Sequence, residues 1–386
     1  MDTLLRETLQ AASSYSTPPF WQMSGAPFLI YGTGTVAQDV YRAFTASGIP
    51  ITAFIDHLRT VVPSLSHVPV YRPDDTLLTP EARAHGTVIL AIHNYEVDMT
   101  ALIARLSSLG YRRTISMVDV YDHFADELGT RYWLTRRTFY ESCEPMIESA
   151  YRLLADEPSR MWFSGILRFR ITGDYSLLPP PDWGRQYGPP DIPPWHTPLR
   201  LVDCGAFDGD TLKRFLDAEV PIEAVAAFEP DASNFASLSQ FIHQWPSAPH
   251  EAYLWPCAVH STTGELRFDG GKGEASGVSA AGATVVQSVA IDDVLHGFRP
   301  NLIKLDIEGS ECEALLGARH TIGSERPGLA VCVYHRPDHL WEIPLMLERL
   351  TNGTEAGPKY EYFLRGHAHS GFELVLYAVP VASRIS

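Results

Sequence analysis

The 386-residue sequence predicts an α/β protein built from two doubly wound units, the second ending in an antiparallel strand pair at its sheet edge. Two series of alternating strand and helix patterns, at about residues 25–125 and from residue 199 onward, indicate the two units. Each series opens with a glycine turn directly after an apolar strand. The last two strand patterns, 360–364 and 372–379, have no helix between them and are therefore expected to pair antiparallel.

Composition limits the classes of partner. An apolar fraction of 45% and a charged fraction of 20% are ordinary for a protein with a sizeable core. The net charge of −16, without a dense Lys/Arg run, argues against a nucleic-acid partner, because that affinity depends on positive charge. The sequence shows no signal peptide and no apolar run of membrane length. Its five cysteines are dispersed and expected to be reduced, so we expect a cytoplasmic protein with no membrane partner.

The N-terminal series contains a dinucleotide-type turn. A strand at 27–31 leads through Gly32-Thr33-Gly34-Thr35-Val36-Ala37 into a helix, and the next strand, 51–55, ends at Asp56. A G-x-G-x-x-A turn followed by an acid about twenty residues later is typical of nucleotide-binding βαβ units. Two functions stay open for the domain at 25–125: it binds a nucleotide or sugar nucleotide, or it is structural and supports a homodimer.

A connector is expected at residues 126–198. Its first part, to about residue 178, has helical patterns, whereas 178–198 contains eight prolines. Proline at that density is incompatible with a regular helix or a central strand. Three aromatic residues of this stretch, Trp183, Tyr187 and Trp195, either anchor it on the protein or cover a ligand, and anchoring is the simpler reading.

The second domain, residues 199–386, places polar residues at its strand ends. Strands at 200–204, 224–228, 252–256, 301–305 and 328–334 lead into Asp203, Glu229, Cys257-Ala258, Asp306 and His335. In a doubly wound sheet ligands bind beyond the carboxyl ends of the strands. We therefore expect these residues to surround one cleft.

The stretch Asp203-Cys204-Gly205-Ala206-Phe207-Asp208-Gly209-Asp210-Thr211 predicts a ligand-binding turn between a buried strand and a helix. Its glycines allow a close approach of backbone to ligand, and the helix start offers free N–H groups. Glu229 follows Gly209 at the spacing, about twenty residues, at which an acid reaches a ribose diol.

Three segments in this order, 203–211, Ala227-Phe228-Glu229-Pro230 and 303–311 (Ile-Lys-Leu-Asp-Ile-Glu-Gly-Ser-Glu), resemble the FkbM family of S-adenosylmethionine-dependent methyltransferases. Cys257-Ala258-Val259 and the following Gly264-Glu265-Leu266 also resemble that family, and the likeness covers about residues 199–380. It implies a class I methyltransferase fold and a hydroxyl oxygen as methyl acceptor. The N-terminal domain resembles, more loosely, the Rossmann-like nucleotide-sugar-binding domains found beside sugar-modifying enzymes.

The resemblance also implies a set of cofactor-binding residues. It assigns the methionine end of S-adenosylmethionine to the loop, the ribose to Glu229 and the adenine to two residues near 258. The residues concerned are Asp203, Gly205, Ala206, Asp208, Gly209, Glu229, Pro230, Ala258 and Val259. Phe207 stands where many methyltransferases have a middle glycine, although members of this family often carry a larger residue there.

An alcohol acceptor must lose a proton, and Asp306, Glu308 and His335 are the candidate catalytic residues. A strand-end histidine bonded to backbone is the plain alternative for His335. No diagnostic metal spacing is present, so no metal is assigned, and Mg²⁺ held by the oxygens of the acidic pair Asp306 and Glu308 is the alternative. The sequence thus predicts an O-methyltransferase acting on a glycan, a sugar nucleotide or a related small hydroxylated metabolite. The alternatives are a nicotinamide-dependent oxidoreductase using the Gly32 turn, and an inactive tandem binding module.

Overall fold

The computed structural model describes residues 1–16, 27–57, 68–269, 277–278, 282, 284–351 and 359–381. They form two compact units, and each is described by itself. The first comprises Met1–Pro145, Met161–Pro181 and Ala368–Phe372, and the second comprises the rest. Both units draw on separated stretches of the chain, whereas the boundaries suggested by the sequence at 125 and 198 assume continuous ones.

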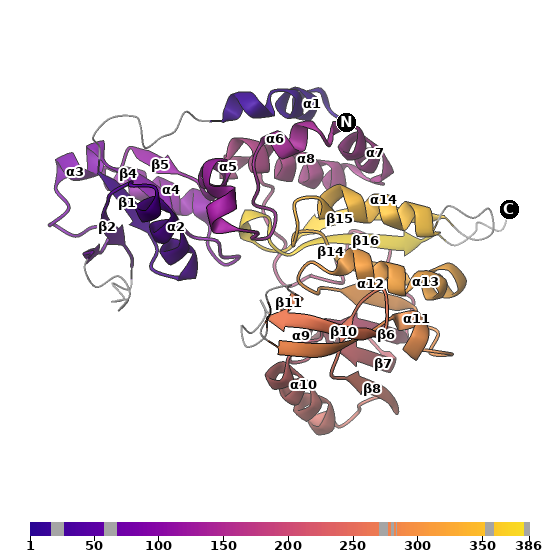
Figure 1. The fold of residues 1–386 in the computed structure, drawn as a ribbon. Coiled ribbons are helices and arrows are strands. Elements are labelled where there is room, and N and C mark those ends of the chain that lie inside the picture. The colour runs from indigo at the N-terminus through magenta and orange to yellow at the C-terminus, as the bar shows by residue number, and fades with distance from the viewer. Residues whose placement is uncertain are drawn as a thin grey trace. The chain divides into compact units, whose positions relative to one another are not determined.

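The first unit contains a five-stranded parallel sheet in the order β3-β2-β1-β4-β5 (Figure 1). Its strands are β1 (Phe28–Tyr31), β2 (Ile51–Ile55), β3 (Val70–Tyr71), β4 (Thr87–Leu90) and β5 (Arg113–Ile115). Every residue of β1 and β4 is buried, which explains their uninterrupted apolar sequences. Helices α2 (Thr35–Ala46), α3 (Pro80–His85) and α4 (Met99–Ser108) connect these strands.

Further helices precede and follow this sheet. They are α1 (Thr3–Gln10), η1 (Ala12–Tyr15), α5 (Met117–Leu128), α6 (Thr138–Glu141), α7 (Glu144–Leu153), α8 (Glu157–Thr172) and η4 (Tyr175–Leu177). The helical pattern predicted for 126–178 therefore corresponds to several short helices and one long one. Among the described helices, none is long and apolar enough to cross a membrane.

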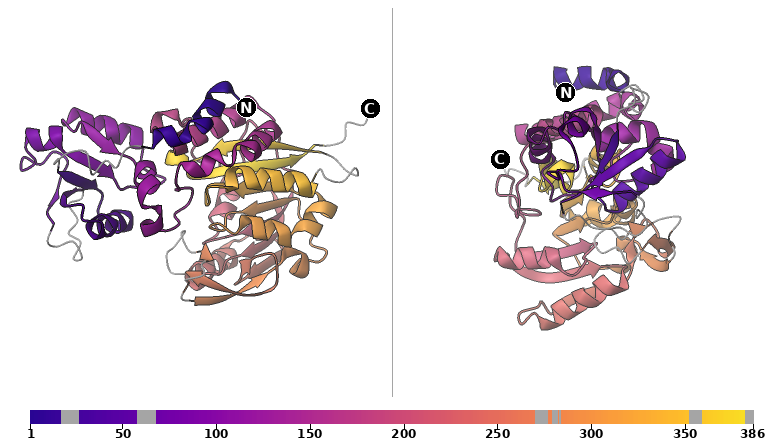
Figure 2. Two further views of the ribbon diagram at one scale, coloured as in Figure 1. Left: turned by 45° about the horizontal axis from the view of Figure 1, so that its top comes forward. Right: turned by 90° about the vertical axis from the view of Figure 1, so that its left-hand side faces the viewer.

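The second unit contains a seven-stranded sheet in the order β15-β16-β14-β13-β6-β7-β8. Its strands are β6 (Leu199–Cys204), β7 (Ile222–Phe228), β8 (Glu251–Trp255), β13 (Leu302–Leu305), β14 (Gly328–Cys332), β15 (Tyr360–Gly366) and β16 (Leu374–Pro380). Only β16 runs antiparallel to its neighbours β14 and β15. This confirms the predicted closing pair, which can be followed in yellow in the left-hand view of Figure 2.

Five helices follow strands of this sheet or connect them: α9 (Asp210–Asp217), α10 (Ala232–Gln244), α12 (Glu311–Gly317), α13 (Arg319–Glu325) and α14 (His339–Thr351). The turn η6 (His369–Gly371) precedes β16 and is assigned to the first unit. A parallel sheet with an antiparallel last strand inserted beside its edge agrees with a class I methyltransferase fold, as predicted.

A smaller sheet, in the order β11-β10-β12-β9, is inserted between β8 and the short helix α11 (Ile291–Val294). Its strands are β9 (Ala258–Val259), β10 (Gly264–Asp269), β11 (Gly277–Val278) and β12 (Thr284–Val289). The sequence also predicts that a Gly/Ser/Ala-rich loop at 270–282 helps to select the acceptor, and this loop lies almost wholly outside the described residues.

A buried ion pair links the two central strands of the large sheet. Lys304 on β13 is paired in register with Asp203 on β6, and Lys304 Nζ lies 3.1 Å from Asp203 Oδ1. The same ammonium group donates a hydrogen bond of 2.6 Å to the carbonyl oxygen of Gly205. The side chains of Lys304 and Asp203 are 2% and 0% exposed, so each needs the other to compensate its charge.

We predict that Lys304→Met lowers the free energy of unfolding by about 3 kcal/mol, because it leaves Asp203 as an uncompensated buried charge. Urea unfolding followed by circular dichroism measures the loss. Lys213→Met is the matched control, since Lys213 pairs with Asp208 at an exposed position and should cost less than about 1 kcal/mol. Equal losses in the two variants would contradict the assignment.

Candidate active site

The loop after β6 is shaped by residues in left-handed backbone conformations. Gly205 has φ +79°, and a Cβ there would overlap the carbonyl oxygen of Asp306. Gly209 has φ +88°, and a Cβ there would lie 2.6 Å from the ring of Phe241. Between them Phe207 holds φ +46°, a costly conformation for a residue with a side chain. The glycines that the sequence singled out are therefore required by the backbone path.

Glu229, at the end of β7, holds this loop in place. Its carboxylate accepts hydrogen bonds from the backbone N–H groups of Phe207, at 2.9 Å, and Asp231, at 2.8 Å. Burial raises the pKa of the Glu229 carboxyl, while these hydrogen bonds act to lower it. The side chain of Asn234 also hydrogen-bonds to this carboxylate, so three of its four acceptor sites are used and one is left for a ligand hydroxyl.

Asp203 lies beneath the loop. Burial raises its pKa to about 6, against the opposing charge of Lys304. Its Oδ2 is buried without a hydrogen-bond partner, and so is the hydroxyl of Thr211 in the first turn of α9. Both side chains are 0% exposed.

The other residues predicted to bind cofactor occupy three places. Ala206 is buried within the loop, Asp208 pairs with Lys213 at its surface, and Pro230 follows Glu229. The backbone N–H of Glu229 donates to the carbonyl of Trp255 at the end of β8. Ala258 and Val259 follow shortly after Trp255, in β9, where both are buried. Their contacts with cofactor stay predictions.

The candidate catalytic residues meet at the carboxyl ends of β13 and β14. His335 Nε2 lies 3.4 Å from Asp306 Oδ1 and 3.8 Å from Glu308 Oε1. Its Nδ1 lies 2.7 Å from Glu311 Oε1, a residue that the sequence analysis did not assign to the site. The plain alternative of a histidine bonded only to backbone is therefore not what the structure shows.

His335 is surrounded by carboxylates. Burial would lower its pKa, but the charges of Glu311 and Glu308 and the hydrogen bond to Glu311 outweigh burial and raise the pKa to about 10. Burial raises the pKa of Glu308 to about 8. Burial also acts to raise the pKa of Glu311, but His335 and His339 hold it well below its usual range. At neutral pH His335 is thus an imidazolium and has no lone pair to accept a proton, so it can act as a base only in alkaline solution.

Several residues of this region were missed from the sequence. Tyr187, in the Pro-rich segment, donates from its hydroxyl to Asp306 Oδ2 at 2.9 Å. The hydroxyl of Tyr334 donates to Glu373 Oε1 at 3.0 Å, and the amide of Gln186 donates to Glu373 Oε2. Glu373 comes just before β16, and only the antiparallel direction of that strand could have indicated that it lies at this edge.

The aromatic residues of the Pro-rich segment differ in their roles. Tyr187 is 2% exposed, and its carbonyl accepts a hydrogen bond of 2.5 Å from the indole of Trp195. Trp183 is 49% exposed. Tyr187 thus anchors the Pro-rich segment on the protein, and its hydroxyl also contacts Asp306 in the candidate site.

Within the described part of the chain, one group of three side chains could offer ligand atoms to a metal ion. It consists of Asp306, Cys332 and Glu373, whose potential ligand atoms lie within 4.8 Å of one another. Both carboxylates already accept hydrogen bonds from Tyr187, Tyr334 and Gln186. The carboxylates of Asp306 and Glu373 thus already have hydrogen-bond donors from the protein.

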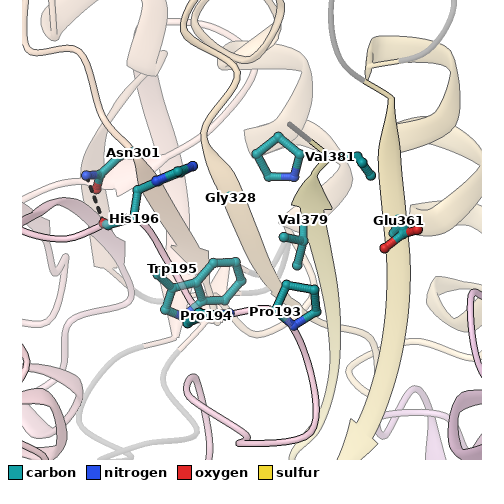
Figure 3. Close-up of a pocket in the computed structure, with 10 residues that line it drawn as sticks. Pro193, Pro194, Trp195, His196, Asn301, Gly328, Glu361, Val379 and Val381 are labelled. Carbon is teal, nitrogen blue, oxygen red and sulfur yellow. Dashed lines mark hydrogen bonds between the residues drawn. The ribbon is translucent and has the colours of Figure 1, made fainter. Parts of the chain in front are cut away.

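A cavity of about 300 Å³ lies at the other end of the large sheet (Figure 3). It is bordered by Gly328, which begins β14, and by Val379 and Pro380 near the end of antiparallel β16. The amide of Asn301 donates to the carbonyl of His196 at 3.1 Å beside it. Because this is the amino-terminal edge of the parallel strands, the cavity is separate from the candidate active site.

In the first unit, the predicted glycine turn does meet the acid that follows it. Gly32 has φ +104°, Gly34 is the N-cap of α2, and the hydroxyl of Thr33 donates to Asp56 Oδ2 at 2.8 Å. The nucleotide proposed for this turn stays a prediction.

We predict that His335 contributes pH-dependent stability. Its pKa is raised to about 10 in the folded protein from an ordinary 6.5, so the contribution is complete below about pH 6.5 and is lost as pH rises through 10. The melting temperatures of the wild type and His335→Gln should therefore differ most near pH 6 and converge toward pH 10. Scanning calorimetry measures this difference.

The control is His320→Gln, at an exposed position, which should leave the melting temperature unchanged at every pH. A wild-type to His335→Gln difference that stayed constant across the pH range would show that His335 is not held as a cation.

A comparison with solved structures supports the fold. The chain is similar to methyltransferase FkbM from Methylobacillus flagellatus KT, with a TM-score of 0.74 and 18% sequence identity. The similarity covers 97% of this chain and 99% of that chain. At this identity the similarity establishes the fold alone. No protein of curated function matches the sequence.

A family model matches part of the second unit. The methyltransferase FkbM domain model matches residues 203–361, which begin at the buried Asp203 of the glycine loop and reach into the edge strand β15. The match includes Glu229, Asp306, Glu308 and His335. Residues 203–361 of this chain are an FkbM methyltransferase domain.

Proposed function

We propose that the protein is an S-adenosylmethionine-dependent methyltransferase that methylates a hydroxyl oxygen of a glycan, a sugar nucleotide or a related metabolite. The observation that carries the proposal is the adjacency of two groups of residues in one FkbM domain. The glycine loop with Glu229 lies at the ends of β6 and β7, and the carboxylate cluster lies at the ends of the neighbouring β13 and β14.

The residues of the loop fit the cofactor. A Cβ at Gly205 would overlap the carbonyl oxygen of Asp306, so this turn needs glycine, and the Glu229 carboxylate has an acceptor site left for a ribose hydroxyl. Asp203 Oδ2 and the Thr211 hydroxyl are buried polar atoms without partners under the same loop. A ligand that carries an ammonium group and several hydroxyls suits this donor and acceptor set.

When bound, S-adenosylmethionine supplies a methyl group on a positively charged sulfur, which leaves as a neutral thioether. The protein then has to hold the acceptor oxygen in line with that methyl group and take up the acceptor's proton. The carboxylates of Asp306 and Glu308 lie at the required edge of the sheet. His335, as an imidazolium, balances the charge of Asp306 and Glu311, whereas Glu308, whose pKa is raised to about 8, is largely uncharged at neutral pH.

The charge of the site favours one class of acceptor. Four acids lie around the His335 cation: Asp306, Glu308, Glu311 and Glu373. A second histidine, His339, lies beside Glu311. Such a surrounding repels a phosphate or carboxylate next to the reacting atom. A neutral hydroxyl group of a sugar or similar polyol is compatible with it.

Titration with S-adenosylhomocysteine by isothermal calorimetry tests the proposal, and we expect one binding site per chain. A parallel melting assay with NAD(H) tests the oxidoreductase alternative. Stabilisation by NAD(H) together with no binding of S-adenosylhomocysteine would overturn the proposal. Binding without methylation of any compound in a broad acceptor panel would favour the inactive binding module.

We predict that Glu229→Gln weakens S-adenosylhomocysteine binding by about 10- to 100-fold. Hydrogen bonds to a charged acceptor contribute about 1.5–3 kcal/mol each, and the new amide group also faces the N–H of Phe207. Calorimetry measures the dissociation constants. Glu223→Gln, at an exposed position on β7, is the control and should bind as the wild type does.

Unchanged affinity in Glu229→Gln would remove the ribose role from this residue.

A further inference from the structure

Glu373 is a carboxylate at the active edge that lies outside the matched methyltransferase domain. It precedes Leu374, the first residue of β16, and the carbonyl of Leu374 accepts a hydrogen bond of 2.9 Å from the N–H of Val333. Because β16 runs antiparallel to β14, its beginning lies beside the end of β14. The chain therefore brings Glu373 next to Tyr334 and His335 from a different strand.

The Glu373 side chain is held by two donors. Tyr334 and Gln186 each donate to one of its carboxylate oxygens. Its backbone has φ +48°, the left-handed region that a residue with a long side chain rarely occupies. Such strain persists where the surroundings enforce it, and it is concentrated at functional sites. Residue 373 as a whole is neither fully buried nor exposed.

The three other acids of the cluster lie beside His335. Glu311 accepts from His335 and from the backbone N–H of Ile307. Asp306 lies within 3.4 Å of the His335 imidazole and accepts from Tyr187, and Glu308 lies 3.8 Å from the same imidazole. Within the described part of the chain Glu373 forms no ion pair, and the two groups that donate to it are neutral.

Its surroundings also suit proton transfer near neutral pH. Burial, and next the charge of Asp306, raise the pKa of Glu373 to about 7, against the hydrogen bonds of Gln186 and Tyr334 and the charge of His335. The charge of Glu373 also acts on four other titratable groups nearby, those of Glu308, Tyr187, Cys332 and Tyr377. A base is most effective when its pKa lies near the working pH.

We propose that Glu373 is the general base that takes the proton from the acceptor's hydroxyl group. The proposal rests on the proposed O-methyl transfer. The O–H bond of the acceptor breaks and its proton goes to the Glu373 carboxylate. The electron pair left on oxygen forms the new O–CH₃ bond, while the bond between methyl and sulfur breaks and leaves its pair on the neutral sulfur.

The test compares Glu373→Gln with Glu361→Gln in the full chain. Glu361 is an exposed glutamate on the neighbouring strand β15, at the cavity end of the sheet (Figure 3), and serves as the matched control. Glutamine keeps the size of residue 373 and an oxygen that can accept from Tyr334, so the fold should be retained. Methyl transfer to a panel of methyl glycosides and sugar nucleotides is measured as released S-adenosylhomocysteine.

We expect Glu373→Gln to lower kcat by about 10²- to 10⁴-fold, the range for loss of a positioned base. The acceptor KM and the dissociation constant of S-adenosylhomocysteine should stay within about threefold of the wild type, because the base acts on the transferred proton and not on cofactor binding. Glu361→Gln should match the wild type in all three quantities. A kcat in Glu373→Gln above half the wild-type value would overturn the proposal.

A second readout needs no acceptor. In protein labelled with ¹³C at the glutamate carboxyl carbons and saturated with S-adenosylhomocysteine, we expect two glutamate carboxyls with raised pKa values, Glu373 near 7 and Glu308 near 8; the signal that titrates near pH 7 should be missing in Glu373→Gln but present in Glu361→Gln. A titration near pH 7 that persists in Glu373→Gln would exclude Glu373 as its source and overturn the assignment. A failure of the proposed function is distinguishable, because the wild-type protein itself would then not bind S-adenosylhomocysteine.

Discussion

The candidate site depends on the ion pair between Lys304 and Asp203 under the glycine loop. Lys304 binds the carboxylate of one central strand and the carbonyl of Gly205 that follows it. An ammonium group in an apolar sheet is costly unless each of its partners is in place. The pair therefore fixes the register of β6 and β13 and the start of the loop at the same time. Glu229 completes this by holding the loop from β7.

The second feature is the distribution of charge at the strand ends. His335 is fully buried, yet it is held as a cation, because carboxylates contact both of its ring nitrogens. This makes it a partner for Glu311 and Asp306. In the proposed reaction the acceptor's proton goes to a carboxylate. Glu373, just before β16, is a carboxylate whose two hydrogen-bond donors are neutral.

Much of this could be predicted from the sequence, because apolar runs, glycine turns and strand-end acids are local patterns. They identified the class I fold, the loop at 203–209 and the meeting of Asp306, Glu308 and His335. The role of Glu311 was missed because a helix residue turned inward leaves no distinct pattern beside Glu308. Gln186 and Tyr187 lie more than 100 residues before Asp306, in a segment without periodicity, so only the tertiary structure brings them together. The protonation of His335 depends on burial, which a sequence does not contain.

The two halves of the candidate site depend on different strand pairings. β16 is hydrogen-bonded on both sides, to β14 and to β15, and the N–H of Ala155 donates to the carbonyl of Tyr362 on the outer side of β15. The glycine loop follows β6, which is paired with β13 and β7. A shift in the register of β16 on β14 would therefore displace Glu373 and leave the loop and Glu229 in place. The position of Glu373 is fixed by a pairing that the loop does not need.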